Sequence, residues 1–385
     1  MLNIVMPNGA SFGWGICGKM IASEIKKQLP IQFYTSKFSQ QSIQDEFIYH
    51  HLKTCVHPIE NAPFSGKERP ALQAIADHEM NAWGPDFSSG FRMGYTFFEN
   101  NCLSNTAIQN AQKFDCIATG STWCSDVLQS FGIKNTFPVL QGIDTQVFHP
   151  ANNLKRHFQD KFVIFSGGKF EFRKAQDIVI AVVKRLMEKY DDVLFVNSWY
   201  NLWPQTMQSI AHSPHIKTVN KQGTFTEIIN AILAVNGIDL NRVITLPLLP
   251  NAQMASIYKN TDIGLFPNRC EGGTNLVLME YLACGKATIV SNFSGHCDIV
   301  TEKNSLRITN AHEVQLKNNG VTTAIWQEPD IDETYALLEQ AYINREKLQT
   351  FGSTAGRDLQ QYTWENTAIN FIRIFENQGI SLKLI

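Results

Sequence analysis

Short apolar runs recur along the chain, and each is followed by a turn and an amphipathic stretch. This alternation is typical of βα units, which build a parallel sheet covered by helices. Residues 38–80 are polar and rich in histidine, and their pattern predicts no definite element. In the rest of the first half the pattern predicts strands at Leu2–Met6, Ile31–Thr35, Arg92–Phe97, Cys116–Thr119 and Phe137–Leu140.

The second half repeats the same rhythm and predicts a second doubly wound sheet. Helices are expected at Gln176–Tyr190 and Asn275–Ala283. The expected strands are Phe162–Ser166, Val193–Asn197, Val243–Leu246, Ile263–Pro267 and Ala287–Ser291.

The segment Gln141–Pro150 breaks both periodicities and carries a glycine and a proline, so we expect the hinge there. The stretch Ala355–Asn377 predicts one or two helices that bury an aromatic face and cross back onto the first domain. The expected organisation is therefore two Rossmann-like domains, 1–148 and 149–355, with C-terminal helices at 356–385. Two such domains imply a cleft between them.

Composition narrows the class of protein. The chain has 385 residues, 44% of them hydrophobic and 18% charged, which suits a globular protein of two domains. The formal charge is −2 with scattered lysines and arginines, so no basic surface favours nucleic acid. The eight cysteines form no C-x-x-C pair, which favours buried thiols in a reducing compartment over disulfides or a zinc site.

The N-terminus runs directly into the first predicted strand, without the features of a signal peptide. The sequence has no apolar stretch of the length that a membrane span needs. We therefore expect a soluble cytoplasmic enzyme, and peripheral attachment to a membrane stays open.

The first predicted strand leads into Gly13-Trp-Gly15-Ile-Cys-Gly18, ahead of a helical run expected at Lys19–Leu29. This matches the G-x-G-x-x-G fingerprint of dinucleotide-binding proteins. That fingerprint also needs an acid at the end of the second strand, where this chain has Thr35. The dinucleotide interpretation is weakened, and two alternatives stay open: a phosphate site, or a tight turn without a ligand.

The second domain opens with a strand and a glycine turn that ends in Gly168, followed by Lys169, Arg173 and Lys174 just before a helix. Cations at a helix N-terminus are unfavourable, so three of them call for a countercharge. A diphosphate would supply it, and a solvated basic loop is the alternative.

The most informative segment runs from Ile263 to Gly285. It predicts a buried strand, a glycine-rich turn and a helix with Thr274 or Asn275 as the N-cap. Glu271 precedes the helix and Glu280 lies in its second turn among apolar neighbours. A carboxylate is costly there unless it is hydrogen-bonded, so recognition of sugar and ribose hydroxyls would explain both acids.

The order of these motifs over nearly the whole chain resembles the retaining glycosyltransferases of family 4, which have the GT-B fold. The motifs are the glycine-rich loop after the first strand, the Gly142-Ile-Asp linker, the Gly-Gly-Lys-x4-Lys loop, the Pro-Asn-Arg-x-Glu segment and a terminal Tyr-Thr-Trp. The resemblance implies a GT-B enzyme that takes a UDP- or GDP-sugar as donor.

The resemblance also implies roles for individual residues. Lys169 and Lys174 would hold the donor diphosphate, with Lys169 standing where an arginine is usual, and Arg173 could replace either. Glu271 would grip the transferred sugar and Glu280 the ribose hydroxyls. The backbone groups expected to bind the donor are those of Gly13, Gly15, Gly168, Gly272, Gly273, Thr274 and Asn275.

Two departures from the family pattern stand out. Eight residues separate Glu271 from Glu280, one more than is usual, so the loop between them is expected to differ. The family commonly has a histidine after a middle strand of the first domain, where this chain has Glu99. Glu99 is therefore the candidate for the group that faces the reacting carbon or the acceptor. His78 is its rival, while His57 and His296 are interpreted as structural.

We therefore expect an enzyme that transfers a hexose from a nucleoside-diphosphate sugar to a glycan, lipid-linked or small-molecule acceptor. Retention is implied by the resemblance, and helix N-termini with lysines would replace a metal. One alternative is an epimerase or hydrolase of the same fold. Another is a protein that binds the sugar nucleotide without turnover, which Glu99 in place of histidine favours. The base, the sugar, the acceptor and the oligomeric state cannot be predicted from this sequence.

Overall fold

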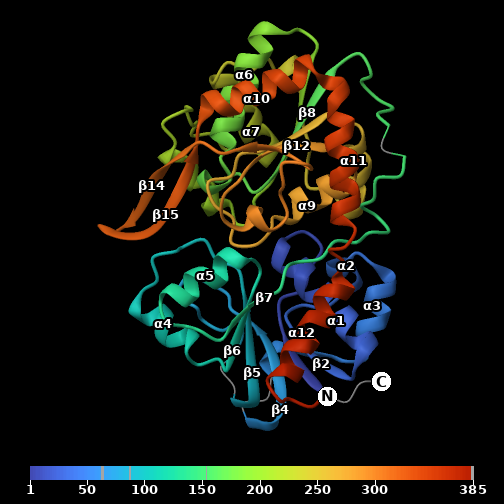
Figure 1. Ribbon diagram of the computed structural model, residues 1–385, viewed down its shortest axis with the longest axis vertical. Coiled ribbons are helices and arrows are strands. Elements are labelled where there is room, and N and C mark those ends of the chain that lie inside the picture. The colour runs from blue at the N-terminus through green and yellow to red at the C-terminus, as the bar shows by residue number, and fades with distance from the viewer. Residues whose placement is uncertain (62–64, 86–87, 153, 383–385) are drawn as a thin grey trace.

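The computed structural model describes residues 1–61, 65–85, 88–152 and 154–382. Two α/β domains lie one above the other in Figure 1, and each is built on one parallel sheet. The expected pair of Rossmann-like domains is confirmed. The last three residues of the segment predicted at 356–385 lie outside the described part of the chain.

The N-terminal sheet has the order β3-β2-β1-β4-β5-β6-β7, so the strand order reverses between β1 and β4. The side chains of Leu2, Ile4 and Phe33 on its central strands are fully buried, as the apolar runs predict. Its strands are β1 (Leu2–Val5), β2 (Ile31–Thr35), β3 (Val56–Pro58), β4 (Ser65–Ala74), β5 (Ser88–Thr96), β6 (Cys116–Thr119) and β7 (Thr136–Pro138). Its helices are α1 (Gly13–Gln28), α2 (Gln40–Ile43), α3 (Glu46–Leu52), α4 (Asn105–Ala111) and α5 (Thr122–Ser130).

The C-terminal sheet has the order β10-β9-β8-β11-β12-β13, and its strand order reverses between β8 and β11. Ile263 at the start of β11 pairs with Ile164 of β8. Its strands are β8 (Phe162–Gly168), β9 (Val193–Trp199), β10 (Val243–Thr245), β11 (Ile263–Phe266), β12 (Ala287–Ser291) and β13 (Leu306–Ile308). Its helices are α6 (Gln176–Lys189), α7 (Phe225–Val235), α8 (Met254–Lys259), α9 (Leu276–Ala283) and α10 (Ile331–Ile343).

An antiparallel hairpin, β14 (Ala311–Asn318) and β15 (Val321–Pro329), projects from the C-terminal domain (Figure 1). It contacts the loop after β5 of the other domain. Asn101 bonds the backbone of Ile325 through both ends of its side-chain amide, at 2.8 and 2.9 Å. The indole of Trp326 donates to the carbonyl of Glu99 at 2.8 Å. The hairpin was not predicted, and it fixes the loop that carries Glu99.

Two C-terminal helices join the domains: α11 (Leu348–Leu359) packs on the C-terminal domain, and α12 (Trp364–Asn377) lies on the N-terminal domain beside α1 (Figure 1). Trp364, Phe371 and Phe375 of α12 are buried in the N-terminal core. The crossing predicted from the aromatic spacing is confirmed. No described helix is long and apolar enough to cross a membrane.

The start of α1 differs from the prediction. The helix begins at Gly13 and not at Lys19, so the glycines of the motif form its first turns. A Cβ on Gly18 would lie 1.9 Å from the carbonyl oxygen of Pro7, so only glycine lets the helix pack this closely on the end of β1. Gly18 therefore serves helix–strand packing.

Candidate functional site

A cavity of ≈ 510 Å³ lies between the carboxyl edges of the two sheets. Its walls are the segments that follow β1, β4 and β5 in one domain and β8, β9, β10 and β11 in the other. Ligands of α/β proteins bind at this edge, where the strand order reverses. The predicted site residues that line the cavity are Gly13, Glu99, Gly168, Lys169, Arg173, Lys174, Glu271, Gly273, Asn275 and Glu280.

Glu271 lies at the centre of a charged cluster in this cavity. Its carboxylate accepts hydrogen bonds from Lys174 and from the amide of Asn268, and it lies 3.1 Å from Arg173 Nη1. Its backbone N–H donates to Ser294 Oγ at 2.8 Å. Burial alone would raise the pKa of Glu271, but Lys174 and Arg173 outweigh it and lower the pKa to about 2. Glu271 is therefore an ionised, rigidly held acceptor of hydrogen bonds.

The countercharge for the cations at the start of α6 comes from the protein itself. Arg173 contacts Glu171 at 2.6 Å and Glu99 at 3.3 Å in addition to Glu271. The countercharge that the sequence calls for is therefore present without a bound diphosphate. Glu171 is close to Arg173 in the sequence, Glu271 is distant in the sequence, and the packing of the two domains brings Glu99 to Arg173.

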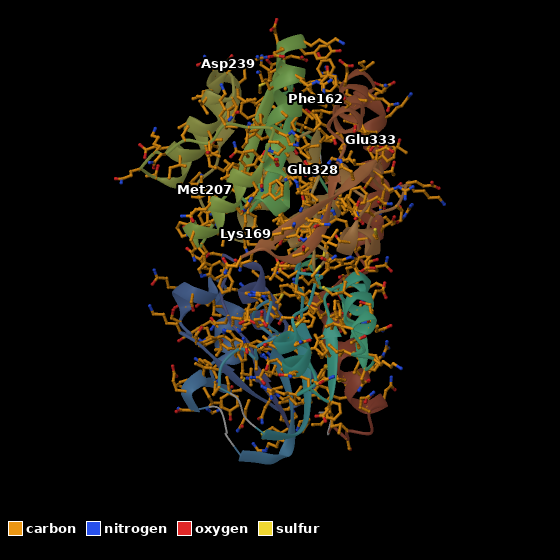
Figure 2. The ribbon with its side chains drawn as sticks, turned by 90° about the vertical axis from the view of Figure 1, so that its left-hand side faces the viewer. Phe162, Lys169, Met207, Asp239, Glu328 and Glu333 are labelled. Atoms are coloured by element: carbon orange, nitrogen blue, oxygen red, sulfur yellow. The ribbon has the colours of Figure 1, made fainter. Side chains whose placement is uncertain are left out.

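Lys169, the third of these cations, contacts an aromatic ring. Its ammonium lies 5.5 Å from the centre of the Trp203 ring, which also meets the ring of Phe12 from the other domain at 5.7 Å. Figure 2 shows Lys169 at the edge of the C-terminal domain that faces the N-terminal domain. Its position leaves the ammonium able to meet an anion in the cavity.

Glu280 projects from α9 into the same cavity and is 4% exposed. Its carboxyl contacts the amide of Asn251 at 2.8 Å and the hydroxyl of Tyr258 at 3.4 Å. Burial raises the pKa of Glu280 to about 8, against the lowering effect of these two hydrogen bonds. The sequence identified Glu280 by its apolar neighbours but did not identify its partners Asn251 and Tyr258.

Asn275 stands at the N-cap position of α9 but does not cap it with its side chain, contrary to the prediction. Its backbone has φ +65°, in the region that L residues rarely adopt. Its amide nitrogen lies 3.3 Å from His296 Nε2, while Nδ1 of that ring lies 3.2 Å from the carbonyl of Ser291. Burial and the nearby Lys174 and Arg173 lower the pKa of His296 to about 4, so the ring is neutral.

These distances fit one arrangement of the imidazole proton: Nδ1–H donates to the Ser291 carbonyl and Nε2 accepts from Asn275. His296 thus holds the loop between Glu271 and Glu280 at Asn275. Its side chain is fully buried, and its contact with Asn275 could not be predicted from the sequence.

Three predicted donor-binding residues do not line the cavity. Gly15 lies within α1, where a Cβ would meet the ring of Phe12 at 2.7 Å. Thr274 is buried, with its hydroxyl 2.9 Å from the sulfur of Met279. Gly272 is pressed against the other domain: a Cβ there would lie 2.2 Å from the carbonyl oxygen of Phe98. Gly13 does face the cavity, at a helix start that carries no side-chain cap and no acid in its first turn.

The carbonyl of Gly272 joins the two domains. It accepts hydrogen bonds from the hydroxyl of Ser121 at 2.6 Å and from the thiol of Cys124 at 2.9 Å. The loop after β11 is therefore fixed on one side by α5 of the N-terminal domain. The backbone left to face the cavity is that of Gly273 and Asn275.

Arg269 sits beneath the cluster and is fully buried. Its guanidinium bonds both oxygens of Asp177, at 2.9 and 2.7 Å, and both oxygens of Glu328, while its backbone N–H donates to the carbonyl of Arg173. Oxygens of Asp177 and Glu328 and a ring nitrogen of His215 lie within 4.8 Å of one another, which suits a metal. Because the guanidinium already occupies both carboxylates, we interpret this group as an ion network that supports Arg173.

His78, the rival of Glu99, also lines the cavity and is exposed. Its contact within hydrogen-bond or ion-pair range is Glu79 at 3.7 Å. Glu99, in contrast, contacts Arg173, and the same guanidinium also contacts Glu271. His57 lies on β3 and stacks on Tyr34, away from the cavity.

Residues 160–320 match the protein family described as glycosyl transferases group 1. No curated protein sequence matches the chain significantly. Among solved structures, sucrose-phosphate synthase from Thermosynechococcus elongatus is similar with a TM-score of 0.65 at 12% identity, over 98% of both chains. Anabaena Alr3699/HepE in complex with UDP and glucose gives a TM-score of 0.64 at 14% identity, over 98% of this chain and 99% of that one.

A glycosyltransferase from Rickettsia africae gives a TM-score of 0.63 at 10% identity, over 98% of this chain and 97% of that one. At such identities the likeness concerns the fold. The chain therefore has the GT-B arrangement of glycosyltransferase structures, and its second domain carries a region similar to the group 1 glycosyl transferases.

Proposed function

We propose that this protein is a glycosyltransferase that moves a hexose from a nucleoside-diphosphate sugar to a hydroxyl group of an acceptor. The observation that carries the proposal is the place of Glu271: an ionised carboxylate held between Lys174 and Arg173, in the cavity between the two domains, with Glu280 in the same cavity. Support comes from the group 1 family match and from the UDP and glucose bound by the Anabaena relative in fold.

In this proposal Glu280 and Asn251 take the ribose hydroxyls, and Lys169 with the N-terminus of α1 takes the diphosphate. Glu271 and the backbone of Gly273 and Asn275 hold the sugar. Lys174 and Arg173 are shared between Glu271 and the phosphate that carries the sugar, so donor binding would redistribute existing ion pairs.

The proposed reaction keeps the configuration of the anomeric carbon. The acceptor oxygen forms a bond to that carbon, the bond from the carbon to the diphosphate oxygen breaks, and its electron pair leaves on the diphosphate. The proton of the acceptor hydroxyl passes to a departing phosphate oxygen. The cations and helix N-termini stabilise the charge that develops there, so the proposal needs no metal ion.

The test is a thermal-shift screen against the diphosphates of uridine, guanosine and adenosine and their hexose conjugates. A ligand that binds only the folded state raises its stability, by about 2.7 kcal/mol when its concentration is 100 times Kd. Transfer and donor hydrolysis are then measured with and without EDTA. A shift with none of these ligands would reject the proposal, and activity that EDTA abolishes and Mn²⁺ restores would reject its metal-independent form.

One observation favours a protein that binds the donor without turnover. Arg173 is already paired with Glu171 and Glu271 of its own domain and with Glu99 of the other domain, so three acids compete with a departing diphosphate for this cation. Tight donor binding with neither hydrolysis nor transfer would support this second function.

A further inference from the structure

The N-terminal half of the cavity carries a stacked pair of aromatic rings. The ring centres of Trp14 and Phe97 are 4.0 Å apart, with 23° between their planes. The buried ring of Tyr95 meets both of them edge-on, at 5.9 and 5.8 Å. Trp14 and Phe97 are themselves half-buried and line the cavity. The pair is therefore a fixed apolar surface, anchored on the core from behind.

This surface adjoins the loop that is proposed to hold the transferred sugar. The Cβ of Phe97 lies 3.7 Å from the position that a Cβ on Gly273 would take. The step that follows rests on the proposed function, because it takes Gly273 as a neighbour of the reacting carbon. A group placed on the Trp14–Phe97 pair would then lie beside that carbon, on the side of the N-terminal domain.

Charge is distributed unevenly between the two halves of the cavity. The cations that line it, Lys169, Arg173 and Lys174, all belong to the C-terminal domain. Among the described residues, the N-terminal half contributes the carboxylates of Asp77 and Glu99 and no lysine or arginine. A bound donor adds the negative charge of its diphosphate. A phosphorylated acceptor would therefore meet like charges and find no cation on its own side.

We propose that the acceptor is an uncharged saccharide whose ring lies against the Trp14–Phe97 pair. The C–H face of a sugar matches a flat apolar ring, and its hydroxyls need polar partners at the rim. Ser11 and Asn100 line the same cavity and can provide such partners. A lipid chain fits less well, because the N-terminal half of the cavity also carries these polar groups and the carboxylate of Asp77.

The wild-type protein tests the acceptor class directly. With the donor found by thermal shift, transfer is measured to neutral oligosaccharides, to the same sugars carrying a phosphate, and to a long-chain alcohol. We expect kcat/KM for a neutral sugar to exceed that for its phosphate by at least about tenfold, since like-charge juxtaposition suppresses wrong partners. Equal or better use of the phosphate or of the alcohol would overturn the inference.

Two failures are distinguishable in this experiment. Absence of donor binding rejects the proposed function and the acceptor inference together. Donor binding and hydrolysis with transfer to none of the saccharides rejects the acceptor inference alone.

Variants test the surface itself. Trp14→Ala should raise the acceptor KM by about tenfold, which corresponds to about 1.4 kcal/mol, because tryptophan is enriched among the contact residues whose truncation is most costly, while the donor Kd stays unchanged. Trp14→Phe keeps a flat ring and should retain most of the affinity. The matched control is Trp83→Ala, a half-buried tryptophan of the same domain that does not line the cavity. An unchanged acceptor KM in a Trp14→Ala protein that still binds donor contradicts the inference.

Trp14 also packs on the core, so Trp14→Ala can affect folding as well as acceptor binding. A second variant is therefore placed at an exposed position. His78→Arg adds a cation to the exposed N-terminal wall of the cavity. We expect it to narrow the preference for neutral over phosphorylated acceptors by at least about threefold, and a preference that is unchanged or larger counts against the inference.

Discussion

The side-chain amide of Asn275 lies 3.3 Å from Nε2 of His296, at the one residue of the loop before α9 whose backbone has φ +65°. An asparagine tolerates this conformation better than most residues that carry a Cβ. Strained residues nevertheless persist only where their surroundings hold them. His296 is therefore a positioning residue for the backbone of Gly273 and Asn275.

The first prediction separates this role from plain packing. His296→Gln keeps an oxygen that can accept from Asn275, whereas His296→Leu removes the acceptor and leaves the amide unsatisfied. A lost hydrogen bond of this kind costs about 1–3 kcal/mol, so His296→Leu should weaken sugar-nucleotide binding about 5- to 150-fold while sparing the bare diphosphate. Isothermal titration with both ligands checks this. If His296→Gln and His296→Leu lose the same affinity, the contact with Asn275 has no positioning role.

The second prediction concerns stability in acid. The folded pKa of Glu271 is about 2, below the ordinary glutamate pKa of 4.5, and that of His296 is about 4, below the ordinary histidine pKa of 6.5. As the pH falls from 6.5 to 4 the unfolded chain gains a proton at His296 that the folded chain does not, and from 4.5 to 2 the same holds for Glu271. Each of these two groups therefore contributes a fall in stability as the pH falls through its own window, with a slope of up to about 1.4 kcal/mol per pH unit, while Glu280 has the opposite effect between pH 8 and 4.5.

Urea unfolding from pH 7 to pH 3 measures this slope. Relative to wild type, His296→Gln should lose the contribution between pH 6.5 and 4 and keep the contribution of Glu271 at lower pH. If wild type and His296→Gln have the same slope between pH 6.5 and 4, the assignment of a buried neutral imidazole is contradicted.

The third prediction concerns the ion pair of Lys174 and Glu271. Because both side chains are buried and in contact, Lys174→Met leaves Glu271 with Arg173 and Asn268 only, and should destabilise the fold by about 1–3 kcal/mol. The double variant Lys174→Met with Glu271→Gln removes both charges and should recover part of this loss. A double-mutant cycle with zero coupling energy would mean that the pair contributes nothing in solution.

Much of the fold follows from the sequence, because buried parallel strands are continuous apolar runs. The strands at Ile31–Thr35, Cys116–Thr119 and Ala287–Ser291 have the predicted bounds. The hairpin β14–β15 escaped prediction because most residues of β14 are exposed, and its partner is the loop of Asn101 in the other domain. No local pattern reports such a contact.

The site was predictable only in part, because its motifs are local in the sequence but the contacts between them are not. Glu271 and Glu280 belong to one sequence motif and the cations after β8 to another. The fold brings both motifs to the same cavity. What the sequence could not provide is the partner of each charge. Cations near a helix N-terminus indicate that an anion is needed, but the pattern cannot tell a ligand phosphate from Glu99, which packing delivers from another domain. Glycines likewise indicate close approach without saying whether they face an open cavity, as Gly13 does, or pack against a carbonyl group, as Gly18 does.

The fourth prediction uses the raised pKa of Glu280, which is about 8 against an ordinary glutamate pKa of 4.5. If this carboxyl accepts hydrogen bonds from both ribose hydroxyls, it must lose its proton on binding, so affinity for a nucleoside should rise with pH and level off above pH 8. The slope is at most about tenfold per pH unit when one proton is released. The matched control is Glu280→Gln, whose affinity should be lower and independent of pH. The same pH dependence in the variant would assign the proton to another group.

The same pKa has the opposite sign for stability. Between pH 4.5 and 8 the folded chain keeps a proton on Glu280 that the unfolded chain loses, so this group makes the fold less stable as the pH rises through that window. Glu280→Gln removes the effect, and its stability relative to wild type should therefore increase from pH 5 to pH 8.

The last prediction concerns Glu99, whose carboxylate lies 3.3 Å from Arg173 and whose backbone is held by Trp326 of the hairpin. A carboxylate fixed beside the donor sugar can stabilise the positive charge that develops at the anomeric carbon. Glu99→Gln keeps the shape and removes this charge, so kcat should fall by about 100- to 1,000-fold, as for the loss of one preorganised group, while donor affinity changes little. The control is Glu171→Gln, which removes another close acid of Arg173 but lies outside the cavity lining. If both variants lose kcat equally, the effect of Glu99 runs through Arg173, and Glu99 is an interdomain contact that does not act on the reacting carbon.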